Sequence, residues 1–254
     1  MHLKVQGLVV RTTPSKDSDL LLTLLTADHG RITAKVRGAK RKNSRLIAAC
    51  QLLTFCEFTL FEYQDMFTVN EAEILSQFSA LTQDLDKLAL GTYFAQAAEL
   101  VAQEDTETAD VLRLVLNSLY ALNRNLASDV QIKAVFELRL ACLAGYTPSI
   151  HGCVHCANPF PNRFNIVEGH LECSDCSDGR SYGIRIPVNS GMLDAMRYIC
   201  SCPDDRMLSF RLSDENIDRL SSLTEGYLST QLERGFTALD FYKSLNIRQW
   251  NEHN

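Results

Sequence analysis

Two pairs of cysteines constrain this chain more than any other feature of its sequence. Each pair is a Cys-x-x-Cys motif, and sixteen residues separate the second cysteine of the first pair from the first of the second. Proteins bind zinc with two turns at this spacing, because four thiolates complete the tetrahedral shell that the ion prefers. A closed shell leaves no position for water, so the pattern predicts a structural zinc site formed by Cys153, Cys156, Cys173 and Cys176.

The same cysteines have other interpretations. They could be four reduced thiols without a metal, or one motif could form a redox disulfide, which would leave the second motif unexplained. His151, His155 and His170 lie nearby in the sequence and could replace a cysteine as ligand. We expect them instead to be solvated or to contact the ligands, since four thiolates already fill the tetrahedron. Residues 164–171 alternate in the manner of a hairpin that delivers the second pair.

Composition bounds the remaining possibilities. The chain has 254 residues, 46% hydrophobic and 22% charged, which is enough for a core and for two or three modules. No apolar run has the length of a membrane span, and the first residues lack the pattern of a signal peptide. Nine cysteines in such a chain indicate the reducing cytoplasm. We expect Cys50, Cys56 and Cys142 to pack as small hydrophobes, and Cys200 and Cys202 to bind no metal.

Charge is distributed unevenly along the chain. Residues 1–45 carry 10 Lys and Arg against 3 acids, whereas the rest of the chain carries 15 against 28. The excess is concentrated in residues 35–45, which contain no acid. Such a segment binds polyanions, because each neutralised phosphate releases counterions; a solvated basic loop is the alternative. The residues that we expect to contact a phosphate backbone are Lys35, Arg37, Lys40, Arg41, Lys42 and Arg45.

The setting of this basic segment predicts a small barrel. Alternation of apolar and polar residues indicates five short strands, and the basic segment falls between the third and the fourth. Their expected ranges are 3–11, 19–26, 31–37, 51–62 and 66–74, with a loop at 12–18. Five strands with a long loop after the third fit an oligonucleotide-binding (OB) fold. Its aromatic residues could stack on bases, but side chains of this kind in strands usually fill the barrel.

Beyond residue 76 the periodicity becomes helical. Apolar residues recur at three- and four-residue steps, and Ser128 is placed to cap one of the helices. The expected helices cover residues 85–101, 106–124, 128–143, 189–199, 213–232 and 237–245. The predicted fold is therefore α+β: a five-stranded OB-fold nucleic-acid-binding domain at residues 1–78, then an all-α helical domain at residues 79–254. The four-cysteine zinc loop is inserted in the helical domain at about residues 150–180.

The order of these parts resembles the RecO family of bacterial recombination mediators, over nearly the whole chain. The resemblance rests on the barrel, the run Gly38-Ala39-Lys40-Arg41, the helical body, and the junction Leu143-Ala144-Gly145-Tyr146-Thr147-Pro148 ahead of Cys153. It implies a cytoplasmic, nucleoid-associated DNA repair protein that binds single- and double-stranded DNA and anneals complementary strands. With its partner RecR, such a protein helps to load recombinase onto strands coated by single-strand-binding protein.

The resemblance also implies capture of the C-terminal tail of single-strand-binding protein, which is acidic and ends in apolar residues. Such a tail needs an apolar pocket with a basic rim. Arg124, Lys133 and Arg139 are among the few basic residues of the acidic helical body, so we expect them to form that rim. The alternative is that they pair with neighbours such as Glu137.

No catalytic motif competes with a binding function. The sequence contains no GxxxxGK[ST] phosphate loop, no HExxH helix and no GxSxG elbow, and no His-x-Glu precedes Cys153 as a zinc deaminase would require. We therefore expect a protein that is not an enzyme, with zinc as a structural cofactor and no membrane partner. The alternative function is that of a zinc-ribbon nucleic-acid adaptor in transcription or translation.

Overall fold

The computed structural model describes the backbone of residues 2–16, 18–64, 66–177 and 182–252, and the side chains among them up to residue 245. The chain divides into two compact units. Unit 1 consists of Met1–Arg124 together with Phe236–Asn254, and unit 2 is the continuous segment Asn125–Gly235.

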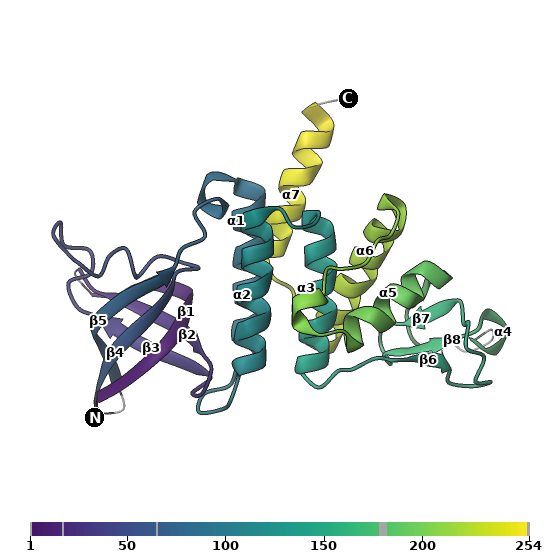
Figure 1. The fold of residues 1–254 in the computed structure, drawn as a ribbon, viewed down its shortest axis with the longest axis horizontal. Coiled ribbons are helices and arrows are strands. Elements are labelled where there is room, and N and C mark those ends of the chain that lie inside the picture. Colours follow the sequence, from purple (N-terminus) through teal and green to yellow (C-terminus); the bar gives the residue numbers. More distant parts are fainter. Residues whose placement is uncertain (1, 17, 65, 178–181, 253–254) are drawn as a thin grey trace. The chain divides into compact units, whose positions relative to one another are not determined.

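Unit 1 contains a closed barrel of five strands in the order β1-β2-β3-β5-β4 (Figure 1). β3 and β5 pair in parallel, and the other neighbours are antiparallel. This arrangement confirms the predicted five-stranded barrel of the OB type. The strands are β1 (His2–Pro14), β2 (Leu20–Thr26), β3 (Arg31–Val36), β4 (Phe55–Tyr63) and β5 (Met66–Ser76).

Buried and less buried residues alternate along the strands, and the buried ones form the barrel core. In β3 the residues Ile32, Ala34 and Val36 are buried, while those between them are half-buried. Two strand boundaries differ from the prediction by three or more residues. The first strand continues to Pro14 because it keeps its pairing with β2 to that point. The fourth strand begins only at Phe55, since residues 51–53 form turns.

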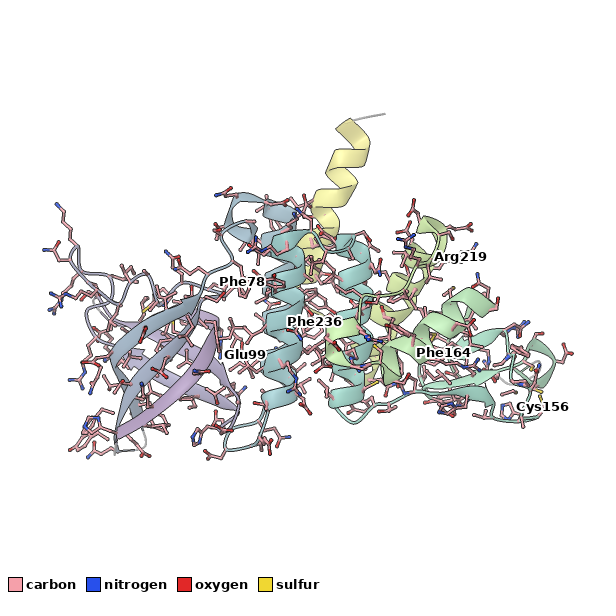
Figure 2. All side chains as sticks on the ribbon, viewed as in Figure 1. Phe78, Glu99, Cys156, Phe164, Arg219 and Phe236 are labelled. Carbon is pink, nitrogen blue, oxygen red and sulfur yellow. The ribbon has the colours of Figure 1, made fainter. Side chains whose placement is uncertain are left out.

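Three helices complete unit 1: α1 (Leu85–Val101), α2 (Ala109–Arg124) and α7 (Thr237–Glu252), with a short 3-10 turn η1 (Leu81–Gln83) before α1. Asp84 caps α1 by accepting a hydrogen bond from the Lys87 N–H. The ring of Phe236, just before α7, packs edge-on against Tyr93 of α1 with centroids 5.2 Å apart (Figure 2). Glu99 of α1 forms an ion pair of 2.7 Å with Arg11 of the barrel.

Unit 2 combines three longer helices with a small sheet. The helices are α3 (Asp129–Leu143), α5 (Ser190–Ser201) and α6 (Asp214–Gln231), and a 3-10 turn η2 (Asp204–Arg206) lies between the last two. Ser128 caps α3 as predicted, by accepting from the Gln131 N–H. α3 packs against both α5 and α6. The helical body expected after the barrel is therefore present.

The sheet of unit 2 has four short strands in the order β6-β8-β7-β9. They are β6 (Ser149–Cys153), β7 (Arg163–Asn165), β8 (His170–Glu172) and β9 (Arg185–Pro187), and the short helix α4 (Ser174–Ser177) follows β8. The antiparallel pair β7–β8 confirms the predicted hairpin, whereas β6 and β9 were not predicted. Phe164 of the hairpin packs edge-on against Tyr227 of α6, with centroids 5.3 Å apart, which anchors the sheet to the helices.

The two units divide the helices differently from the sequence-based domain boundaries. Residues 79–254 were expected to form one helical domain, but α1, α2 and α7 belong to the same compact unit as the barrel. The reason is that α1 contacts β1 and α2 contacts β2, while α7 packs against α1 although the two helices are far apart in the chain. That residues 1–78 form an independent domain, separate from residues 79–254, stays a prediction.

Candidate metal centre and nucleic-acid interface

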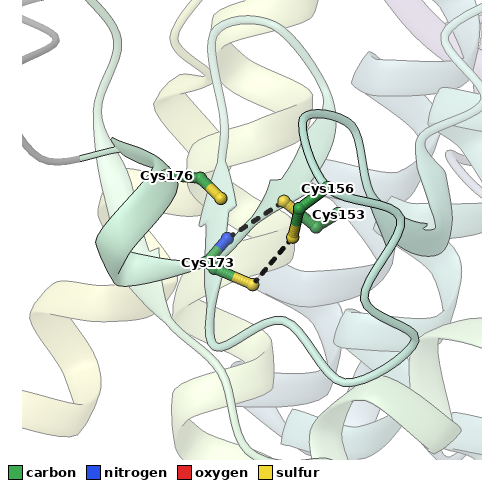
Figure 3. A group of neighbouring side chains, drawn as sticks. All are labelled: Cys153, Cys156, Cys173 and Cys176. Atoms are coloured by element: carbon green, nitrogen blue, oxygen red, sulfur yellow. Dashed lines mark hydrogen bonds between the residues drawn. The ribbon is translucent and has the colours of Figure 1, made fainter.

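The structure brings the four predicted ligands together at one end of the small sheet (Figure 3). Cys153 ends β6, Cys156 lies in the following turn, Cys173 follows β8 and Cys176 lies in α4. Their Sγ atoms all lie within 4.8 Å of one another, and those of Cys156 and Cys173 are 3.8 Å apart. Tetrahedral zinc with bonds of about 2.3 Å separates its sulfur ligands by about 3.8 Å. The cluster can therefore hold a metal ion with little rearrangement.

Backbone N–H groups prepare this cluster for a cation. Burial raises the pKa of the Cys153 thiol, but the N–H groups of His155, Cys156 and Cys173 outweigh it and bring the pKa down to about 6. The Cys173 N–H lies 3.3 Å from this sulfur. The hydrogen bond with Cys156, together with neighbouring thiolates that repel a further negative charge, raises the pKa of Cys176 to about 12. A divalent cation removes that conflict, and thiolates are the ligands that zinc prefers.

One supporting contact could not be read from the cysteine motifs. The side-chain amide of Asn158 donates to the Cys173 sulfur at 3.3 Å, while the backbone carbonyl oxygen of Asn158 accepts from the Cys153 N–H at 2.8 Å. Asn158 thus fixes both halves of the cluster from the turn between them. In the sequence it was visible only as a turn residue beside Pro159.

The predicted basic residues lie at the end of β3 and in the turns that follow it. Arg37, Lys40, Arg41, Lys42 and Arg45 are exposed, and Lys35 is half-buried. Figure 2 shows nitrogen-tipped side chains on the loop that leaves the barrel after β3. Among the residues that the structure describes, no carboxylate forms an ion pair with any of the five exposed cations. Arg45 nevertheless lines a surface hollow that also holds Glu57, Glu71 and Glu73.

Asp19 fixes the base of the basic segment, residues 35–45. Its Oδ1 accepts from the Gly38 N–H at 2.7 Å, and its Oδ2 pairs with Lys35 at 3.0 Å. The Gly38 N–H, followed by Lys35, lowers the pKa of Asp19 below its ordinary value. Ala39 is fully buried in the barrel core and anchors the segment from within. The charged side chains are therefore presented outward from a fixed base, while Lys35 is already engaged.

The aromatic residues of β4 include one that fills the barrel and two that are exposed, where they could stack on bases. Phe58 is fully buried in the barrel, as expected of an aromatic side chain in a strand. Phe61 and Tyr63 are exposed, and Tyr63 retains 64% of its surface. These two rings near the end of β4 are available for stacking on bases.

The three residues expected to form a basic rim lie in different environments. Lys133 is buried, contrary to its expected exposure: its ammonium lies 2.9 Å from both Glu137 of α3 and Glu225 of α6, and it donates to the Ser221 hydroxyl. Its ammonium cannot reach a bound peptide in this conformation, so Lys133 is not a rim residue.

The other two residues differ from Lys133. Arg139 is mostly buried and pairs with Asp204. Arg124 is exposed, and its guanidinium lies 5.8 Å from the centroid of the exposed Tyr120 ring.

A second pair of cysteines was missed by the sequence analysis. Cys142 of α3 and Cys200 of α5 lie with their sulfur atoms 3.7 Å apart, although 58 positions separate them in the chain. The hydrogen bond between Cys142 and Cys200 lowers the pKa of Cys142 to about 7. Cys142 is therefore more than a small apolar side chain, and its partner could not be identified without the packing of α3 on α5.

Comparison with known proteins bears on the whole chain. The family model "Recombination protein O N terminal" matches residues 1–78, and "Recombination protein O C terminal" matches residues 82–240. A DNA repair protein RecO of Acetivibrio thermocellus is 31% identical over 247 residues, which cover 96% of this chain and 98% of that protein. This chain belongs to the RecO family.

Two further relatives agree with this assignment. RecO proteins of Symbiobacterium thermophilum and Alkaliphilus metalliredigens are 28% and 27% identical, over 95% and 96% of this chain and 96% and 100% of their own lengths. RecO is a family of DNA repair proteins by the names of these relatives. Across the described residues, no helix has the length and apolar character needed to cross a bilayer.

Proposed function

We propose that this RecO-family protein is a DNA-binding recombination mediator. It binds single- and double-stranded DNA, anneals complementary strands and, with RecR, helps to load recombinase onto strands coated by single-strand-binding protein. Membership of the family supports the biological setting. One observation of the structure carries the DNA-binding part: five exposed cations gather on one fixed segment of an OB-type barrel, and no ion pair with a described residue engages them.

The basic segment acts on the phosphate backbone. Each cation that replaces condensed counterions contributes to affinity without reading sequence, so the protein can bind any strand. The same cations reduce the repulsion between two phosphate backbones, which is the electrostatic barrier to annealing. The exposed rings of Phe61 and Tyr63 add stacking contacts that favour single strands. This activity is binding and positioning, and it requires neither turnover nor nucleotide triphosphate.

The test is a triple charge reversal at Lys40, Arg41 and Lys42. Replacing all three by Glu is expected to weaken binding to every DNA sequence about equally and to slow annealing. It is also expected to flatten the dependence of log affinity on log salt by roughly 0.7 for each lost single-strand contact. Fluorescence anisotropy with labelled oligonucleotides at several salt concentrations measures both effects.

A matched control separates local contacts from net charge. Arg211, Arg219 and Arg234 are exposed in unit 2, and replacing these three by Glu changes the net charge by the same amount. The control variant is expected to retain the parent's affinity and salt slope. If the Lys40–Arg41–Lys42 variant also retains them, the basic segment is a solvated loop and the proposed interface is wrong.

The cysteine cluster has a structural role in this proposal. We propose that zinc binds Cys153, Cys156, Cys173 and Cys176 and holds the small sheet and α4 in place. A closed shell of four thiolates offers no open position, so the metal takes no part in chemistry. Protein purified without chelators is expected to contain at least one zinc ion per chain, and elemental analysis that finds no metal would contradict this role.

Tail capture is proposed for two separate positions. With Lys133 buried, the cations that remain from the expected rim are Arg124 of unit 1 and Arg139 of unit 2, and Arg124 lies beside the exposed ring of Tyr120. A cation beside an exposed aromatic ring suits a peptide that is acidic and ends in apolar residues. Arg124→Glu and Arg139→Glu are expected to weaken binding of the isolated tail peptide of single-strand-binding protein while DNA binding is retained. Normal peptide binding by both variants would place the pocket elsewhere.

A zinc-ribbon nucleic-acid adaptor of transcription or translation is the second candidate. It is favoured only by the cysteine cluster and the small sheet that carries it. Competition between single-stranded DNA and structured RNA for the protein distinguishes the two. The mediator is expected to retain DNA in this competition, whereas an RNA adaptor would release it.

A further inference from the structure

Three side chains with metal-binding groups gather beside the cysteine cluster without belonging to it. His155 lies in the turn between the first two cysteines, and His170 and Glu172 lie in β8. The two β8 residues are separated by one position, so both project from the same face of the strand. One ligand atom from each of the three residues lies within 4.8 Å of the others.

The spacing of these groups suits a single ion. His155 Nε2 and Glu172 Oε2 are 3.5 Å apart. Bonds of about 2.1 Å to a tetrahedral ion place nitrogen and oxygen ligands about 3.4 Å apart, so these two atoms are already at ligand separation. The imidazole rings of His155 and His170 stand nearly perpendicular, at 85°, with centroids 6.1 Å apart. The rings are thus not stacked on each other.

Burial leaves two ligand atoms without a full complement of partners. The side chain of Glu172 is 99% buried, and its Oε1 accepts from Arg185 Nε at 2.6 Å. Its second oxygen has only the longer contact with His155 among the described residues. His170 Nε2 is also buried and has no hydrogen-bond partner among the described residues, although Glu168 Oε2 lies 3.4 Å away. A buried polar atom without a partner costs about 1–3 kcal/mol, and a bond to a metal would remove that cost.

We propose a second divalent metal site formed by His155, His170 and Glu172. Two imidazoles and one carboxylate are ligands typical of zinc and of similar borderline ions. Three protein ligands leave a fourth position open to water, which the shell of four thiolates does not. The carboxylate of Glu172 is partly neutralised by Arg185, so this site binds its ion more weakly than the thiolates bind theirs. The second ion is therefore exchangeable.

Cobalt titration tests this site while the thiolate site keeps its own metal. Purified protein is dialysed against a mild chelator and titrated with Co²⁺, with uptake followed by calorimetry and visible absorption. One additional equivalent is expected, with ligand-field bands but without the intense near-ultraviolet charge-transfer band that thiolate ligands produce. Total metal content, measured in parallel, reports on the thiolate site, so failure of one site is distinguishable from failure of the other.

Variants assign the ligands. His155→Ala and His170→Ala are each expected to abolish the additional equivalent, and Glu172→Gln to weaken it by at least about tenfold. His151→Ala is the matched control, because His151 is an exposed histidine of β6 outside the cluster. Where a change at the more buried residues prevents folding, the partly exposed His155 decides alone. Absence of uptake by the parent, uptake that survives in His155→Ala, or equal loss in His151→Ala would each overturn the proposal.

Discussion

The buried ion cluster of unit 2 yields a prediction about stability. Lys133 of α3 is the shared cation of two carboxylates, since its ammonium lies 2.9 Å from both Glu137 and Glu225. Lys133 is 4% exposed and Glu137 is fully buried, so water cannot replace the lost contact at Glu137. Lys133→Met keeps the aliphatic volume and removes the charge. The substitution therefore isolates the electrostatic contribution from the contribution of packing.

The expected loss is large because a buried carboxylate is left without its cation. Removing one partner of a buried ion pair costs about 3–5 kcal/mol, a large fraction of the roughly 5–15 kcal/mol by which domains are stable. For a unit of this size the midpoint of thermal unfolding should fall by on the order of 10 to 20 °C. Hydrogen exchange measured on α3 and α6 assigns the loss to unit 2, and exchange in the barrel of unit 1 should be unchanged.

A double variant provides the internal control. In Lys133→Met/Glu137→Gln the uncompensated charge is gone, while the glutamine carbonyl can still accept from the Thr224 hydroxyl, which now lies 2.7 Å from Glu137 Oε2. The double variant is therefore expected to be more stable than the single variant. A single-variant loss below about 1 kcal/mol, or additive losses in the double variant, would refute the argument that an unpaired buried charge dominates.

Three further predictions concern single positions. Cys173→Ser is expected to lower the metal content by one equivalent and to destabilise unit 2 but not unit 1, as measured by elemental analysis and hydrogen exchange; full metal content would exclude Cys173 as a ligand. Gly30→Ala is expected to cost more than about 2 kcal/mol in urea unfolding, since φ is +61° and the new Cβ would lie 1.8 Å from the Gln103 carbonyl oxygen; a neutral result would contradict this geometry. The hydrogen bond from the Gly38 N–H lowers the pKa of Asp19. The contribution of this carboxylate to the stability of the folded state is therefore present above the ordinary pKa of 3.8 and is lost as pH falls through the lowered pKa. The Gly38 amide shift in NMR should follow that titration in the parent and not in Asp19→Asn.

Local patterns in the sequence predicted the elements of this fold where one face is buried. Alternation found β3, because its apolar residues face the barrel core, and Ser128 marked the start of α3 through its capping side chain. The strands β6 and β9 were missed because five and three residues are too few to show a period. The packing of α7 against α1 could not be predicted from neighbouring residues either, because all of unit 2 lies between these two helices in the sequence.

The candidate sites show the same division between local and distant information. The cluster of four cysteines could be predicted from the sequence, because each Cys-x-x-Cys motif supplies two ligands at a fixed spacing. The burial of Lys133 depends on Glu225 of α6, and the proximity of Cys142 to Cys200 depends on α3 meeting α5. Neither follows from residues within one turn of helix. Exposed charge was easier to predict, because the basic segment needs no partner from elsewhere in the chain to remain at the surface.

Unit 1 is interrupted in the sequence, and this affects how the protein is made. Translation produces the barrel and α1 first, then all of unit 2, and only afterwards Phe236 and α7. Until that moment the ring of Phe236 is absent from its place against Tyr93, and α1 exposes apolar surface on the nascent chain. Unit 2 is continuous and can fold as soon as its last residue has left the ribosome. The part of the protein that is synthesised first is therefore the last to be completed.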